Sequence, residues 1–232
     1  MRLRLFAVVP AALGAVALGP NLVGAEEAVM TPPAAQTTPI QPPVGGIENV
    51  EVRGTVPDMM AGTWLMIQSI KPHDDYVNSW TLYRIEHTGK AWAMHQLVGT
   101  PPPALADAIK QANDAGKVLE MTPELLQQVA TMANSLHPPR SEEANREYVF
   151  ATPDQLPPEQ QKNPVIQKSK LTLGVATISP SSTGANNYIF QDMQPDRLSG
   201  PMQAGVVARP AGLPPVPFAV DGIFTMYRLD KK

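Results

Sequence analysis

Residues 79–98 read SWTLYRIEHTGKAWAMHQLV, and they carry the clearest structural pattern in the chain. Two runs in which aromatic and aliphatic residues recur, 79–87 and 90–98, flank the dipeptide Thr88-Gly89. Glycine adopts the positive φ of a tight turn without steric cost. The pattern therefore predicts an antiparallel β-hairpin that turns at Thr88-Gly89.

The length of the hairpin loop decides which residues face each other. A two-residue loop pairs His87 with Lys90 and continues outward from there. One face then carries three cross-strand pairs, namely Ile85 with Trp92, Tyr83 with Met94 and Thr81 with Gln96. The other face carries Trp80 with Leu97, Leu82 with His95 and Arg84 with Ala93. A bulged three-residue loop is the alternative, and it would shift this register.

Residues 62–70 predict another strand upstream of the hairpin. Its apolar residues occupy both faces, with Trp64, Met66 and Ile70 on one side and Leu65 and Ile67 on the other. A strand with apolar residues on both faces is typically buried on both sides.

The periodicity changes to that of a helix after the proline triplet that follows the hairpin. Apolar residues recur at helical spacing from Leu105, and Gly116 is suited to end this first helix. Thr122 is the expected N-cap of a second helix that begins at Pro123. The two segments predict a helical hairpin, inserted at about 103–137, that covers one side of the sheet.

The second half of the chain alternates between strand-like and proline-bearing segments. The expected strands are 147–151, 165–178 with a bulge near Ser169, 188–193, and 218–229. The segment 152–164 has the composition of a linker, and 195–217 that of a long surface loop. The prediction is a mainly β fold of the α+β type. It is an antiparallel sheet or partly closed barrel of about seven or eight strands, with the helical hairpin inserted.

The N-terminal residues indicate export. Two arginines, an apolar run and the small residues before position 26 make residues 1–25 a predicted secretory signal peptide. Residues 26–49 are rich in proline and predict a flexible leader, followed by one globular domain over 50–232. The expected location is therefore periplasmic or extracellular, after cleavage near Ala25.

Composition excludes several classes of function. The 232 residues contain no cysteine, so disulfides, thiolate metal sites and thiol nucleophiles are excluded. The formal net charge of −3 and the absence of a basic cluster argue against a nucleic-acid partner. We expect no integral membrane span in the mature chain, and no cofactor.

Gly62-Thr63-Trp64, at the start of the expected strand 62–70, resembles the Gly-x-Trp signature of lipocalins and related calycin barrels. In that family the glycine and the tryptophan lie on the first barrel strand, and the tryptophan packs across the closed end. The resemblance implies a β-barrel that binds an apolar ligand. The sequence departs from the family in its helical segment, which interrupts the strands in mid-chain instead of following the last one.

The aromatic residues of 62–98 are the candidate ligand-binding residues, because all three tryptophans of the chain lie there. The candidates are Trp64, Trp80, Tyr83, Trp92 and Met94. The alternative is that these side chains simply fill the core. No catalytic residue and no metal ligand is predicted, since no catalytic motif is present and the tripeptide His73-Asp74-Asp75 supplies too few donors for a metal.

The sequence thus favours an exported, non-enzymatic binding protein that holds an apolar small molecule. The expected lining is Trp64, Tyr83, Trp92 and Met94, or Trp80 and Leu82 if the register shifts. The alternative is an accessory or structural subunit of a cell-envelope protein complex, whose proline-bearing stretches 26–46 and 195–217 lie over a partner. An enzyme with an unrecognised site is the third interpretation.

Overall fold

The structure is a computed structural model that describes residues 52–89, 91–136, 145–178, 182–208 and 216–230. The predicted signal peptide, 1–25, and the predicted leader, 26–49, lie outside these residues.

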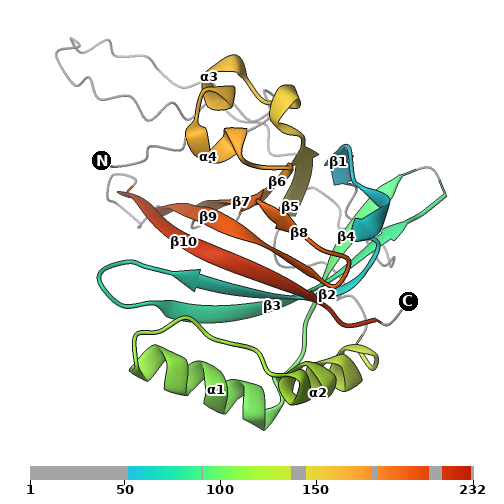
Figure 1. Cartoon of the computed structure of the whole chain (residues 1–232), viewed down its shortest axis with the longest axis vertical. Helices are drawn as coiled ribbons and strands as arrows, with labels where there is room; N and C mark the ends of the chain where they lie inside the picture. Colours follow the sequence, from blue (N-terminus) through green and yellow to red (C-terminus); the bar gives the residue numbers. More distant parts are fainter. Residues whose placement is uncertain (1–51, 90, 137–144, 179–181, 209–215, 231–232) are drawn as a thin grey trace, which may run out of the picture.

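The described residues form one ten-stranded mixed sheet that is nearly closed into a barrel (Figure 1). The strands are β1 Val52–Gly54, β2 Gly62–Ile70, β3 Val77–His87, β4 Trp92–Leu97, β5 Asn145–Ala151, β6 Leu171–Ile178, β7 Ser182–Phe190, β8 Asp192–Met193, β9 Arg197–Ala208 and β10 Val216–Arg228. Their order is β1-β5-β6-β7-β9-β10-β2-β3-β4, with β8 paired to β9.

Eight of these strands form an up-and-down meander whose last strand, β10, pairs with its first, β2. All pairs are antiparallel except that of β1, which runs parallel to β5. The ladder is interrupted between β4 and β5, and β1 lies in this interval, next to both strands. The mainly β fold predicted from sequence is confirmed, and its barrel is nearly closed.

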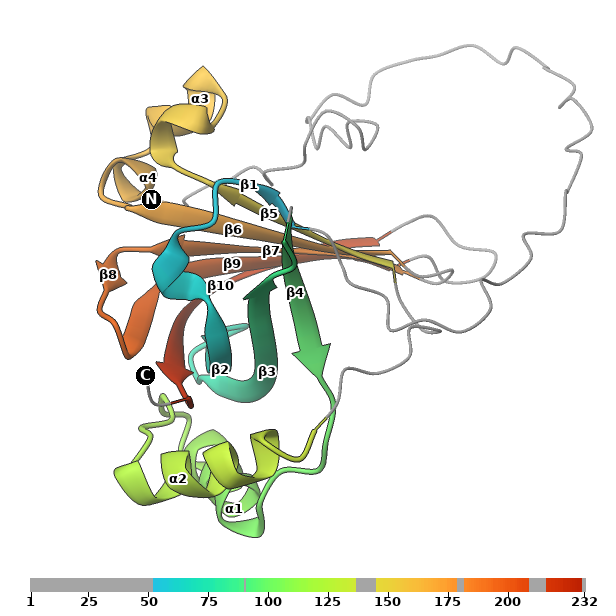
Figure 2. The same ribbon diagram turned by 90° about the vertical axis from the view of Figure 1, so that its right-hand side faces the viewer.

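Helices cover two opposite sides of the barrel (Figure 2). The helices α1 Pro103–Asp114 and α2 Pro123–Ala133 pack against β2, β3 and β4, as the inserted helical hairpin was expected to do. The short helices η2 Pro153–Gln155, α3 Pro158–Gln161 and α4 Pro164–Gln167 lie on the other side. One further turn, η1 Asp58–Met60, enters one end of the barrel.

Strand β2 is buried on both faces because the barrel interior lies on one side and the helical hairpin on the other. Trp64 and Met66 belong to the interior cluster, whereas Leu65 and Ile67 pack with residues of α1 and α2. All four are at most 3% exposed. The prediction of a strand buried on both sides is therefore confirmed.

The predicted hairpin register is wrong by two residues, but its faces are right. The structure pairs His87 with Trp92 and Ile85 with Met94, around a four-residue loop instead of the two-residue loop expected. Thr88 holds this wider loop, since both its amide and its hydroxyl donate hydrogen bonds to the carbonyl of Ala91. A shift of two residues leaves every side chain on its face because the strand period is two.

Two expectations for the second half of the chain are corrected. The expected strand 165–178 begins only at Leu171, because Asn163 caps a helical turn that starts at Pro164. The described residues of the expected surface loop 195–217 are mostly sheet, since β9 and the start of β10 lie there, whereas 209–215 lie outside the described residues. Pro201 fits into β9 because it lies where the partner strand changes from β7 to β8, a break at which proline is tolerated.

The close approach of β9 to the end of β7 generates a prediction about stability. A Cβ on Gly200 would lie 1.9 Å from the carbonyl oxygen of Ile189, whereas a Cβ on Gly184 would meet nothing nearer than 3.8 Å. We expect Gly200→Ala to lower the free energy of unfolding by about 2–3 kcal/mol, because the backbone must move apart. Gly184→Ala is the matched control and should change it by less than about 1 kcal/mol. Urea denaturation measures both, and equal effects would contradict the assigned contact.

Candidate functional site

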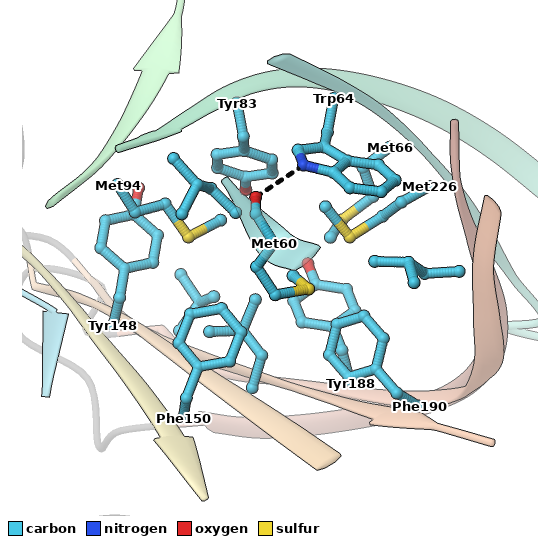
Figure 3. Close-up of a cluster of buried hydrophobic side chains, with 14 of the residues drawn as sticks. Met60, Trp64, Met66, Tyr83, Met94, Tyr148, Phe150, Tyr188, Phe190 and Met226 are labelled. Carbon is cyan, nitrogen blue, oxygen red and sulfur yellow. Dashed lines mark hydrogen bonds between the residues drawn. The ribbon is translucent and has the colours of Figure 1, made fainter. Parts of the chain in front are cut away.

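The barrel interior is the candidate functional site, because it gathers side chains from nearly every strand into one apolar cluster (Figure 3). Its aromatic members come from β2, β3, β5, β7 and β10, and two of them, Phe190 and Phe224, have ring centroids 5.0 Å apart at an interplanar angle of 82°. The interior is filled by these side chains, most of which are essentially inaccessible to solvent.

The structure brings four of the five predicted ligand-binding residues together. Trp64, Tyr83 and Met94 are buried in the interior cluster, and the half-buried Trp92 packs against it. Trp80 does not join them, because it lies on the outer face of β3 and packs with the helices α1 and α2. The first of the two predicted linings therefore matches the inner face of the barrel.

Methionine contributes an unusual share of the interior. The chain has 11 methionines. Five of them are buried in the interior cluster, namely Met60, Met66, Met94, Met202 and Met226. Methionine has three rotatable bonds and a polarisable sulfur, so a methionine-rich interior adapts its shape more readily than one built from branched residues. Met60, which comes from η1, lies in the middle of the cluster (Figure 3).

One end of the barrel is closed by contacts between η1, β2 and β10. The indole Nε1 of Trp64 donates a 2.8 Å hydrogen bond to the carbonyl of Met60. The guanidinium of Arg228 lies 4.4 Å from the centroid of the Trp64 ring and donates hydrogen bonds to the carbonyls of Met59 and Ala61. We call the end of the barrel at η1 the closed end.

Gly62 is required at this end for a geometric reason. Its φ is +138°, and a Cβ there would lie 2.5 Å from an Arg228 nitrogen and 2.6 Å from a carboxylate oxygen of Asp230. Asp230 in turn accepts a hydrogen bond from the amide of Thr63 and lies 3.6 Å from Arg228. The Gly-x-Trp sequence thus provides room for the arginine at its first position and a ring for it at its third.

Three tyrosines direct their rings into the interior (Figure 3). Burial raises the pKa of Tyr83 well above its usual value, the neighbouring hydroxyls of Tyr188 and Tyr148 add to this rise, and the charge of Arg146 opposes it. Burial likewise raises the pKa of Tyr148 to about 12 and that of Tyr188 still further. The hydroxyl of Tyr188 is buried without a hydrogen bond of normal geometry in the described part of the chain. The interior is therefore apolar but contains buried hydroxyl groups.

The far end, opposite η1, has a different character. There β4 ends and β5 begins, and their side chains meet where the ladder is interrupted. A guanidinium nitrogen of Arg146 donates a hydrogen bond to the amide oxygen of Gln96 across this interval. Both residues are half-buried. Arg146 lies two residues before Tyr148 and Gln96 two residues after Met94, so each shares the inward-facing side of its strand with a residue of the interior cluster.

Sequence reasoning missed most of the interior contributed by the second half of the chain. Tyr148, Phe150, Tyr188 and Phe190 are all buried in the cluster, yet none was a candidate. Their alternation along β5 and β7 was a usable signal. Arg146 and Arg228 were missed as well, and only the pairing of distant strands reveals their positions.

The described residues contain no group of three or more His, Asp or Glu side chains placed to hold a metal ion. Within the same residues, every helix is too short or too polar to cross a membrane. Comparison of the chain with protein-family models, curated proteins and solved structures gave no match.

The contacts of the closed end generate a second stability prediction. Arg228→Leu leaves the Met59 and Ala61 carbonyls without a donor, so we expect it to lower the free energy of unfolding by about 2–4 kcal/mol. Arg53→Leu is the control, because its pair with Glu147 is 3.8 Å long and the Arg53 side chain is 55% exposed. Its loss should be below about 1 kcal/mol. Urea denaturation of both variants tests the difference, and a loss at Arg228 no larger than that at Arg53 would show that the closed end is unimportant for stability.

Burial of Tyr148 predicts a loss of stability in alkali. Its pKa is about 12 in the folded protein and about 10 in an unfolded chain, so the folded state retains a proton that the unfolded state releases. This contribution to stability is complete below pH about 10 and decreases as the pH rises to about 12. Unfolding free energies measured across this range should fall less steeply for Tyr148→Phe than for the unmodified protein. Equal slopes would contradict the assigned burial.

Proposed function

We propose that the protein is an exported, non-enzymatic binding protein that holds an apolar small molecule inside its barrel. The observation that carries this proposal is the interior cluster, in which aromatic and methionine side chains from both halves of the chain converge around η1. Small-molecule sites are typically concave and lined by such side chains with a few polar groups among them.

The filled interior is compatible with this role because flexible methionine side chains occupy much of it. The central methionines can change rotamer at low cost, so an apolar ligand can take their place among the aromatic rings. The closed end, by contrast, is fixed by Trp64 and Arg228. We therefore propose that the ligand enters from the far end and displaces methionine side chains from the centre.

The proposal extends the resemblance to lipocalins. The nearly closed barrel is compatible with a calycin-like fold, and Gly62 and Trp64 lie on β2, the first strand of the meander. Trp64 packs at the closed end, where the family places the tryptophan of its signature. Export is proposed from the sequence of residues 1–25, whose charged and apolar segments are typical of a signal peptide.

The alternative, an accessory subunit of a cell-envelope complex, has less support. It depended on proline-bearing stretches available to lie over a partner. In the stretch 195–217, however, β9 pairs with β7, β8 and β10. Backbone groups that are hydrogen-bonded within the barrel are not available to a partner, so residues 197–208 and 216–217 do not favour the alternative. Residues 209–215 lie outside the described residues.

Two single-tryptophan proteins test the proposal. Trp80→Phe with Trp92→Phe leaves only Trp64, which lies in the interior. Trp64→Phe with Trp92→Phe leaves only Trp80, which lies under the helices. The probe is an uncharged long-chain alcohol brominated in mid-chain, because bromine quenches tryptophan emission at short range.

We expect the probe to quench the protein that retains Trp64, with saturation at a defined stoichiometry, and to leave the emission of Trp80 unchanged. Circular dichroism of both proteins checks that they are folded. Quenching of Trp80 alone would place the apolar site under α1 and α2 instead. Quenching of neither would mean that the interior does not accept apolar chains, and the proposal would be abandoned.

A further inference from the structure

We infer that Arg146, at the far end of the barrel, binds the acidic head group of the ligand as a carboxylate, while the ligand's apolar chain lies among the inner-face residues. This inference rests on the proposed function and adds the chemical class of the ligand and its orientation. Three observations support it. Arg146 lies on the inner face of β5, no described residue supplies a counter-ion for it, and buried tyrosine hydroxyls lie nearby.

Charge is almost absent from the inner face. On the inward-facing positions of the described strands, Arg146 and Arg228 are the only lysines or arginines, and no aspartate or glutamate occurs there. A charged side chain on an otherwise apolar face is costly unless it is paired. The two arginines therefore each need an explanation.

The surroundings of Arg228 account for its charge completely. Its guanidinium donates to the carbonyls of Pro195, Ala61 and Met59, lies over the Trp64 ring and is 3.6 Å from Asp230. This arginine closes the barrel, and the carbonyls, the indole ring and the Asp230 carboxylate around it balance its charge.

Arg146 is in the opposite situation. Within the described ranges it donates one hydrogen bond, to Gln96, and no carboxylate lies within 4 Å of it. A guanidinium has five N–H donors, so most of them remain for another acceptor. An acidic group on a bound molecule would supply a counter-charge that no described residue provides.

Arg146 lies outside the part of β5 that pairs with β1 in the described residues. β1 pairs with β5 from Tyr148 to Phe150, and Arg146 lies two residues beyond the first of these pairs, toward the far end. The side chains of Arg146 and Gln96 therefore meet across the interval between β4 and β5. The described part of β1 pairs with β5 only from Tyr148 to Phe150, and does not reach Arg146.

Three buried tyrosines belong to the interior cluster, and two of them, Tyr83 and Tyr148, lie within the electrostatic influence of Arg146. The positive charge of Arg146 acts on the pKa of both Tyr83 and Tyr148, and the rings of these two tyrosines are 6.2 Å apart at nearly a right angle. The hydroxyl of Tyr188, buried without a hydrogen bond of normal geometry, faces the same interior. A carboxylate beside Arg146 would accept hydrogen bonds from donors of this kind.

The single cation favours a carboxylate over a phosphate. A carboxylate carries one negative charge and accepts two parallel hydrogen bonds from the planar fork of an arginine. A phosphate monoester carries between one and two charges and would require a second cation. The chain beneath the head group must be apolar, because the residues that follow Arg146 toward the closed end are Tyr148, Phe150 and the methionines of the cluster.

A matched pair of ligands and a matched pair of variants test the inference. The ligands are hexadecanoate and 1-hexadecanol, which share an apolar chain and differ in the charge of the head group. The variants are Arg146→Gln and Arg53→Gln, because Arg53 pairs with Glu147 and is largely exposed. Affinities are measured at neutral pH on the full mature chain, by displacement of an uncharged fluorescent probe.

We expect the unmodified protein to bind hexadecanoate at least about 10-fold more tightly than hexadecanol, as a charge-assisted hydrogen bond allows. Arg146→Gln should abolish this preference and leave the affinity for hexadecanol unchanged. Arg53→Gln should keep the preference. If Arg146→Gln keeps it too, the head group lies elsewhere and the inference is overturned.

The remaining outcomes separate the inference from the proposed function. Equal binding of the two ligands by the unmodified protein would overturn the inference and leave the proposed function intact. Binding of neither would overturn both. If Arg146→Gln does not fold, Tyr148→Phe replaces it, since it removes a hydroxyl beside the guanidinium and keeps the ring. A preference for hexadecanoate that Tyr148→Phe leaves unchanged would then count against the inference.

Discussion

The pairing of β10 with β2, which ends where Arg228 stacks on Trp64, is the interaction on which the shape of the barrel depends. Arg228 joins η1 and β2, from the beginning of the described chain, to the end of β10. These elements are far apart in sequence, and their association converts a meander of hairpins into a nearly closed barrel with one closed end. The charge of Arg228 is tolerated there because carbonyl oxygens, Asp230 and the indole ring surround it, which offsets the cost of removing it from water.

A second constraint is that β2, β3 and β4 carry apolar residues on both faces. The barrel interior buries only one of these faces, so the other must be covered from outside, and the inserted helices do this. Buried Asn78 on β3 fixes the connection between α1 and α2, because it donates to the carbonyl of Lys117 and accepts from the amide of Leu119. The outer cluster joins the helices to the sheet, whereas the inner cluster combines apolar side chains, adaptable methionines and buried tyrosine hydroxyls.

The faces of the predicted hairpin are right because the strand period alone decides them. Tyr83, Met94 and Trp92 were placed on one face and Trp80 on the other, and this division survives the two-residue error in the hairpin register because both registers have the same parity. The predicted lining residues all lie in 62–98 because they were chosen around the three tryptophans of the chain, which lie there. Glycine and proline are typical of loops, so Gly200 and Pro201 led to a loop prediction for this part of the chain. In the structure both lie within β9, where its partner changes from β7 to β8.

By itself, the sequence determined the class of the fold, the helical insertion and the faces of β2, β3 and β4, because these follow from local periodicity, capping residues and turn residues. Only the tertiary structure decided that the sheet curls into a nearly closed barrel, that Arg228 reaches Trp64, and that Arg146 meets Gln96 across the interval between β4 and β5. These contacts join residues that lie at least 50 positions apart along the chain. No local pattern encodes contacts at that separation, because they depend on how the whole sheet twists and closes.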